Sequence, residues 1–217
     1  MIIIDYKKKY HNKIVKAAVA ALELGKCVVY PTDTSYGIAV DATNFDAIIR
    51  LYRIKERDIN KPIHIIAPSL AKAKKIGQWN KQATQLAQKF WPGPLTLVLK
   101  IKDKQQTYKL LGAKTGNIGL RMPKNTLALD LAKILGRPIT TTSANPSAAA
   151  SGGHDSYSAK EVLTQFRNKK HQPDIVINAG KLAKRKPSTV VKIDNHELTI
   201  LRIGPITKKQ IQNATNS

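Results

Sequence analysis

Residues 28–40 read VVYPTDTSYGIAV, two short apolar runs on either side of a turn in which hydroxyl-bearing residues surround Asp33. Apolar runs of this length are typical of buried strands, and the proline and glycine of the turn restrict its backbone. Three hydroxyls packed around a carboxylate could hold a small polar ligand. Read alone, however, the segment is better explained as an ordinary hydroxyl-rich turn.

The same strand and helix patterns alternate along the rest of the chain. One helix is predicted over residues 12–24 and ends at Gly25, and two others begin at the N-caps Asn44 and Asn125. Another is predicted before Phe90, and a last one follows a capping box in which Ser158 and Glu161 take part. The predicted strands are residues 28–30, 36–40, 63–67, 95–101, 118–121, 139–142, 175–177, 190–193 and 198–203. The pattern predicts a mixed α/β fold with several strands that end in polar loops, where a ligand could bind.

The chain shows neither a repeat nor a low-complexity linker, so we expect one domain over residues 1–205 and a polar C-terminal tail, residues 206–217, that frays. No apolar run reaches 18 residues. The apolar run at the N-terminus is interrupted by the charged Asp5, so it is too short for the hydrophobic region of a signal peptide. We therefore expect no membrane association and a cytoplasmic location. The single cysteine, Cys27, excludes an internal disulfide and is predicted to be buried. The histidines are scattered, without metal-ligand spacing: His11, His64, His154, His171 and His196.

The charge is unusual, because 37 Lys and Arg residues face 14 Asp and Glu residues, a net charge of +23. Such an excess favours a polyanionic partner such as tRNA or another structured RNA. A general lysine bias of the source proteome explains it equally well, since the lysines are spread along the chain. Clusters occur at Lys7–Lys9, Lys72–Lys75, Lys169–Lys170 and Lys184–Lys186. Aromatic residues are few, which argues against recognition by base stacking.

Three further polar segments follow predicted elements. Residues 55–62 carry three cations, Lys55, Arg57 and Lys61, which suit either a polyphosphate clamp or a solvated helix end. Residues 140–153 are rich in small side chains that would let backbone N–H groups approach an anion, but they lack the Gly-Lys-Ser/Thr of a Walker loop. The strand ends carry Arg121, Ser188 and Arg202, and single arginines there are more often surface ion pairs.

Taken in order, these segments resemble the YrdC-like family of threonylcarbamoyl-adenylate synthases, in its short single-domain form. The resemblance covers residues 14–204 and is carried by the following motifs: the turn Pro31–Gly37, Lys55-x-Arg57, Lys61-Pro62, Trp91-Pro92-Gly93-Pro94, Leu120-Arg121-Met122-Pro123, Ser143-Ala144-Asn145 and Ser188-Thr189-Val190. Each motif is weak alone, and together they are specific.

The resemblance implies an open twisted sheet with flanking helices around a deep basic cavity. It also implies a nucleotidyltransferase that condenses L-threonine with bicarbonate and ATP into threonylcarbamoyl-AMP and pyrophosphate. That product serves the t6A37 modification of tRNA through a downstream tRNA-modifying transferase complex. Mg²⁺ would arrive with ATP, so the chain itself needs no metal ligands.

The roles carried over by position fall into two sets. ATP would be bound by Lys55, Arg57, Lys61, Ser143, Asn145, Ser151 and Arg202, and of these Lys55, Arg57, Ser143 and Asn145 are the catalytic candidates. Threonine would be bound by Thr34, Arg121, Thr141 and Ser188, with Arg121 on its carboxylate. Because every participant in the reaction is anionic or becomes so, we expect catalysis by positioning and charge neutralisation rather than by a nucleophilic side chain.

The sequence departs from the family's pattern at residues 146–153, which contain Ser151: relatives often place Leu-Ser-Gly directly after the Ser-Ala-Asn motif, and the loop here is longer or rearranged. Two other functions are consistent with the same charge and scaffold. One is a non-catalytic RNA-binding or ribosome-maturation protein, which would not need the threonine-rich turn and Arg121. The other is a hydrolase or carbamoyltransferase, which would need additional catalytic His or Asp residues.

Overall fold

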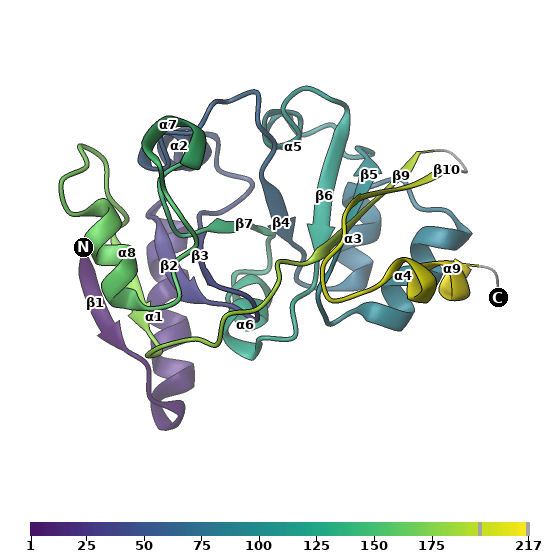
Figure 1. The fold of residues 1–217 in the computed structure, drawn as a ribbon. Helices are drawn as coiled ribbons and strands as arrows, with labels where there is room; N and C mark the ends of the chain where they lie inside the picture. Colours follow the sequence, from purple (N-terminus) through teal and green to yellow (C-terminus); the bar gives the residue numbers. More distant parts are fainter. Residues whose placement is uncertain (195–196, 216–217) are drawn as a thin grey trace.

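A computed structural model of the chain describes residues 1–194 and 197–215, in which ten strands form one sheet (Figure 1). His196 and the last two residues of the predicted tail lie outside the described residues. The strands are β1 (Ile2–Asp5), β2 (Val28–Pro31), β3 (Tyr36–Ala39), β4 (His64–Ile66), β5 (Leu95–Lys100), β6 (Asn117–Arg121), β7 (Ile139–Ser143), β8 (Ile175–Asn178), β9 (Thr189–Asp194) and β10 (Glu197–Arg202). A 3₁₀ turn (Lys8–Tyr10) precedes the helices α1 (His11–Glu23), α2 (Phe45–Ile54), α3 (Leu70–Ile76), α4 (Lys81–Phe90), α5 (Gln106–Leu111), α6 (Thr126–Leu135), α7 (Ala148–Ser151), α8 (Ala159–Phe166) and α9 (Lys208–Thr215).

The sheet has the order β1-β8-β2-β3-β7-β4-β6-β5-β9-β10 and mixes parallel with antiparallel neighbours. Strands β1, β8 and β2 run parallel, whereas β3, β7 and β4 pair antiparallel. Strand β4 pairs parallel with β6, and β5 pairs parallel with β9. Within the described residues no strand pairs with the outer edge of β1 or of β10, so the predicted open mixed α/β sheet is confirmed.

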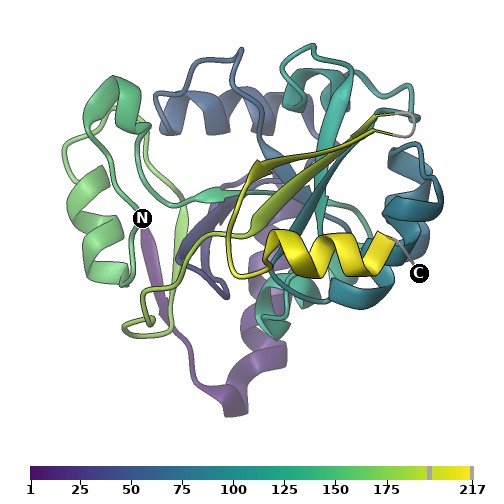
Figure 2. The same ribbon diagram turned by 45° about the vertical axis from the view of Figure 1, so that its right-hand side comes forward.

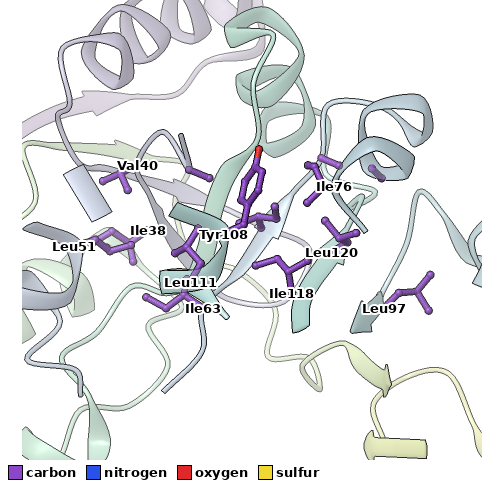
Figure 3. Close-up of a cluster of buried hydrophobic side chains, with 14 of the residues drawn as sticks. Ile38, Val40, Leu51, Ile63, Ile76, Leu97, Tyr108, Leu111, Ile118 and Leu120 are labelled. Carbon is purple, nitrogen blue, oxygen red and sulfur yellow. The ribbon is translucent and has the colours of Figure 1, made fainter. Parts of the chain in front are cut away.

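Each face of the sheet is covered by helices. Helices α1 and α6 pack on one face (Figure 1). The side chains of Val28 and Tyr30 of β2 point to this face. The intervening Val29 points to the opposite face, into a larger core formed with α2, α4, α5 and α8. Figure 3 shows part of this larger core, including Leu51 of α2 and Leu111 of α5. The alternation follows from the two-residue period of a strand.

The predicted helix boundaries are confirmed by their caps. The Asn44 side chain accepts a hydrogen bond from the Ala47 N–H at 3.0 Å, and Asn125 does the same for α6. Ser158 caps α8. Gly25 and Gly136, which follow α1 and α6, have φ of +70°, a conformation that favours glycine. Cys27 is fully buried, as predicted, and burial raises the pKa of its thiol.

The expectation that the segment after residue 205 frays is wrong for residues 208–215. These form α9, which packs against α4 (Figure 2). Ile211 and Ala214 are buried on one side of the helix, and Ile206 is buried just before it. Three apolar residues within a polar segment are therefore enough to anchor it, although they are too few to stand out in the sequence. None of the described helices is both long and apolar enough to cross a membrane.

Candidate functional site

A cavity of about 270 Å³ lies over the central strands, on the face of the sheet against which α1 and α6 also pack. Strand alternation builds its floor. In β5 and β6 every second side chain, such as Leu97 or Leu120, enters the larger core, so the positions between them face the cavity. Four neighbouring strands contribute lining residues to the cavity, among them His64, Thr96, Arg121, Thr141 and Ser143.

The cavity is basic. Three guanidinium groups line it, those of Arg57, Arg121 and Arg202, and among the described lining residues Asp155 is the one carboxylate. Burial lowers the pKa of Arg202, and the neighbouring Arg121 lowers it further. Such a concentration of cations away from bulk water attracts anions.

His64 lines the same cavity as a neutral imidazole. Burial lowers its pKa to about 4, and Arg202, Arg121 and Arg57 add to the effect, in that order. Its ring lies against Gly119 of the neighbouring strand, where a Cβ atom would overlap the imidazole. His64 is therefore an uncharged donor and acceptor group beside the cations of the cavity.

All four residues predicted to bind threonine line this cavity. The Tyr30 hydroxyl donates to Thr141 Oγ1 at 3.3 Å, and the Ser188 hydroxyl lies 2.9 Å from that of Thr96. Thr34 is held by its backbone N–H, which donates to Thr32 Oγ1 at 3.1 Å. The structure therefore brings together residues from four separate segments of the chain.

Arg121 is already engaged inside the protein. Its Nη2 donates to Asp33 Oδ1 at 2.7 Å, and both side chains are largely buried. Arg202 also has protein partners, since its Nε and Nη2 donate to the backbone oxygen and the hydroxyl of Ser188 at 3.0 and 3.2 Å. These contacts fix two of the guanidinium groups before any ligand binds.

The residues predicted to hold ATP are less completely assembled. Arg57, Ser143 and Arg202 line the cavity, whereas Lys55, Lys61, Asn145 and Ser151 are not among its lining residues. Lys61 is exposed to solvent. Asn145 is buried and donates from Nδ2 to the Pro146 oxygen at 2.6 Å. The Ser151 hydroxyl donates to Glu56, which also accepts a hydrogen bond from Lys169 Nζ at 3.0 Å.

Lys55 lies in an environment that its predicted role as an ATP-phosphate ligand does not suggest. Its side chain is buried at the C-terminal end of α2, and its Nζ donates to the backbone oxygens of Ser143 and Asn145 at 2.5 and 2.7 Å. Burial, followed by the nearby Arg57, lowers the Lys55 pKa to about 7. In this structure the Lys55 side chain supports the backbone of the Ser-Ala-Asn motif, residues 143–145.

Sequence reasoning did not single out His64, Thr96 or Asp155, and it noted Asp33 in its turn without indicating the contact with Arg121. Two of them carried a detectable signal. Thr96 and His64 are polar residues within apolar strand patterns, at positions that alternate with core residues. Asp33 and Asp155 lie in loops, and no pattern along the chain indicates what a loop carboxylate will contact. No group of three or more His, Cys, Asp or Glu in the described part of the chain could hold a metal ion.

Comparison with known proteins gives a consistent result. The family model Sua5_yciO_yrdC, described as "Telomere recombination", matches residues 20–204, which include every residue that lines the cavity. A Methanocaldococcus jannaschii protein named "Putative threonylcarbamoyl-AMP synthase" is 34% identical over 94% of this chain and 92% of its own length. The threonylcarbamoyl-AMP synthase of Pyrococcus abyssi is 29% identical over 97% of this chain, which spans 60% of that relative.

Solved structures agree with the sequence matches. The structure of P. abyssi Sua5 complexed with L-threonine has a TM-score of 0.88 and 28% identity, and it covers 99% of this chain and 61% of its own. Escherichia coli YciO has a TM-score of 0.81 and 24% identity, covering 97% of this chain and 98% of its own, and shows a shared fold.

Proposed function

The chain belongs to the Sua5–YciO–YrdC family, and from this premise we propose that it makes threonylcarbamoyl-AMP and pyrophosphate from ATP, L-threonine and bicarbonate. One observation supports the proposal above all. Thr34, Arg121, Thr141 and Ser188 converge on a single cavity together with Arg57 and Arg202. A pocket that combines hydroxyls with several guanidinium groups suits a polar amino acid and an anionic co-substrate.

The reaction needs two bond-forming steps. The threonine amino group attacks the carbon of bicarbonate, which forms a carbamate and releases water. A carbamate oxygen then attacks the α-phosphorus of ATP, and the bond to the β-phosphate oxygen breaks to release pyrophosphate. The class of the enzyme is therefore a nucleotidyltransferase.

The cavity's cations match the charges in this reaction. We assign Arg121 to the threonine carboxylate, and Arg57 and Arg202 to the nucleotide phosphates and the carbamate. Thr34, Thr141 and Ser188 would contact the rest of the amino acid. Mg²⁺ would enter with ATP and be held mainly by phosphates and water. Ser143 and Asn145 would act through their loop, and we assign no direct contact to Lys61 or Ser151.

The product would serve the t6A37 modification of tRNA, which requires a downstream tRNA-modifying transferase. Since ATP and tRNA both occur in the cytoplasm, we place the activity there.

The proposal is tested by pyrophosphate release from ATP, with threonine and bicarbonate omitted in turn. We expect release to need both, and to give a product in which the carbon of bicarbonate joins threonine to AMP. Release that is independent of threonine would contradict the proposal and leave the chain as an ATP hydrolase. No release with all three substrates would favour the non-catalytic RNA-binding function.

A separate property is expected from the charge of +23. Lys74 lines an open hollow of about 870 Å³ beside α4, together with Lys81, Lys102 and Trp79, and residues 184–186 are exposed basic side chains elsewhere. We propose that such surfaces bind structured RNA without sequence preference. Dissociation constants of about micromolar or weaker are expected at physiological salt.

Salt titration with a tRNA measures this property. Log affinity should fall linearly with log salt, and changing Lys72, Lys74 and Lys75 to glutamine should flatten the slope without altering pyrophosphate release. Binding that is insensitive to salt, or absent in low-salt buffer, would contradict this proposal, and the net charge would then be explained by a general lysine bias.

A further inference from the structure

The contact between Arg121 and Asp33 joins the end of β6 to the turn between β2 and β3. The Nη2–Oδ1 distance is 2.7 Å, and the two side chains are 8% and 13% exposed. A carboxylate this close to a buried arginine offsets the cost of burying its charge. Arg57 and Arg202 line the same cavity, so an uncompensated third guanidinium would be repelled from it.

The pair is held by one hydrogen bond rather than two. Arg121 Nε and Asp33 Oδ2 are both buried and have no hydrogen-bond partner among residues 1–194 and 197–215. A side-by-side arginine–carboxylate pair would use two N–H groups and both oxygens. The single contact therefore leaves most of the five N–H donors of the guanidinium unused by Asp33.

Asp33 and Arg121 also face different spaces. Arg121 lines the 270 Å³ cavity, whereas Asp33 is not among its lining residues. Asp33 instead lines a second hollow of about 280 Å³, with Lys124 and Arg185 on its rim. The two hollows share Thr32 and Thr34 as a wall. A ligand in the first cavity would meet the guanidinium with Asp33 behind it.

We propose that Asp33 is a positioning residue: it holds the Arg121 guanidinium so that its unused N–H groups face the cavity and receive the carboxylate of the amino-acid substrate. This inference rests on the proposed function, because it takes the ligand of Arg121 to be threonine. The opposite arrangement has Asp33 occupying the carboxylate's own place, to be displaced by substrate. Because Asp33 lies outside the cavity lining and uses only one donor, the ligand and Asp33 can bind Arg121 at the same time.

The two arrangements predict effects of opposite sign, which calorimetric titration of threonine and of ATP can separate. In the positioning arrangement, Asp33→Ala should weaken threonine binding about 10-fold, the size of one charge-assisted hydrogen bond. Asp33→Asn, which retains an acceptor oxygen without the charge, should lose less. ATP affinity should stay within about twofold for both variants, since no phosphate contact is assigned to this turn. Saturating threonine should restore most of kcat, so the loss should appear in KM.

A matched control is Asp174→Ala, which removes the carboxylate partner of Arg50 on another part of the fold. This variant should lower the melting temperature while leaving threonine affinity unchanged. Equal losses of threonine affinity in Asp174→Ala and Asp33→Ala would overturn the inference, because general destabilisation would then explain both. Unchanged or tighter threonine binding in Asp33→Ala would also overturn it. A wild-type protein that binds ATP but no threonine would instead overturn the proposed function, and this inference with it.

Discussion

Replacing Arg121 by alanine should weaken threonine binding about 100-fold, because two charge-assisted hydrogen bonds to a carboxylate would be lost in a site shielded from water. That factor corresponds to about 2.7 kcal/mol. ATP affinity should change by less than about threefold, since we place the nucleotide phosphates on Arg57 and Arg202. Separate calorimetric titrations of the two ligands measure both effects.

Two further variants serve as controls for Arg121→Ala. Arg121→Lys retains a positive charge but not the planar fork, so it should recover only part of the lost affinity. Arg50→Ala breaks a more exposed ion pair, with Asp174, that lies outside the cavity lining, and should leave threonine binding intact. If Arg121→Ala abolished ATP binding and spared threonine, the two pockets would be exchanged.

Local sequence signals predicted much of the fold. Caps such as Asn44 and Asn125 and the strand patterns fixed most helix and strand positions, because these signals depend on neighbouring residues. Strand β1 was missed since its partner, β8, is almost the whole chain away, and nothing in three isoleucines indicates that pairing. Helix α9 was missed for a related reason: its few apolar residues matter only because α4 lies beside them.

In the candidate site, too, local motifs were predictable and contacts between distant segments were not. The threonine set was predicted from motifs, and its members do line one cavity. Motifs say nothing of what a side chain contacts in the absence of ligand. The contact of Arg121 with Asp33, and that of Lys55 with the Ser143 and Asn145 carbonyls, join segments about 90 residues apart in the sequence. A lysine in a phosphate-binding motif is assumed to face the phosphate, and only the fold shows that this one is buried.

Replacing Lys55 by methionine should weaken ATP binding at least about 10-fold through the loop it supports, because two buried carbonyls would lose their donor. In the ligand-free variant, hydrogen exchange of the loop at residues 143–147 should speed up by a similar factor. If Lys55 instead bound the phosphates directly, Lys55→Met would lower ATP affinity and leave that hydrogen exchange unchanged. Lys75→Met, on the exposed end of α3, is the matched control and should change neither.

The pH dependence of stability and of ATP affinity further distinguishes loop support by Lys55 from direct phosphate binding. Its pKa is lowered to about 7 by burial and Arg57, while Cys27 and Asp155 act in the opposite direction. In the unfolded chain the lysine has its ordinary pKa of 10.5. Between pH 7 and pH 10.5 the unfolded chain therefore binds more protons at this residue than the folded protein does. The free energy of unfolding of the wild type should rise with pH across that range, relative to that of Lys55→Met. A rise of this kind would show that Lys55 titrates in that range.

A neutral amine still has two N–H donors, one for each carbonyl that Lys55 contacts. Support of the loop should therefore survive loss of the proton, whereas attraction to a phosphate would not. We expect the ratio of wild-type to Lys55→Met affinity for ATP to stay constant between about pH 6 and pH 8.5, because the protonation of ATP itself cancels in the ratio. A ratio that falls as the pH rises through 7 would show that the charge of Lys55 acts on the phosphates, as its motif alone suggests.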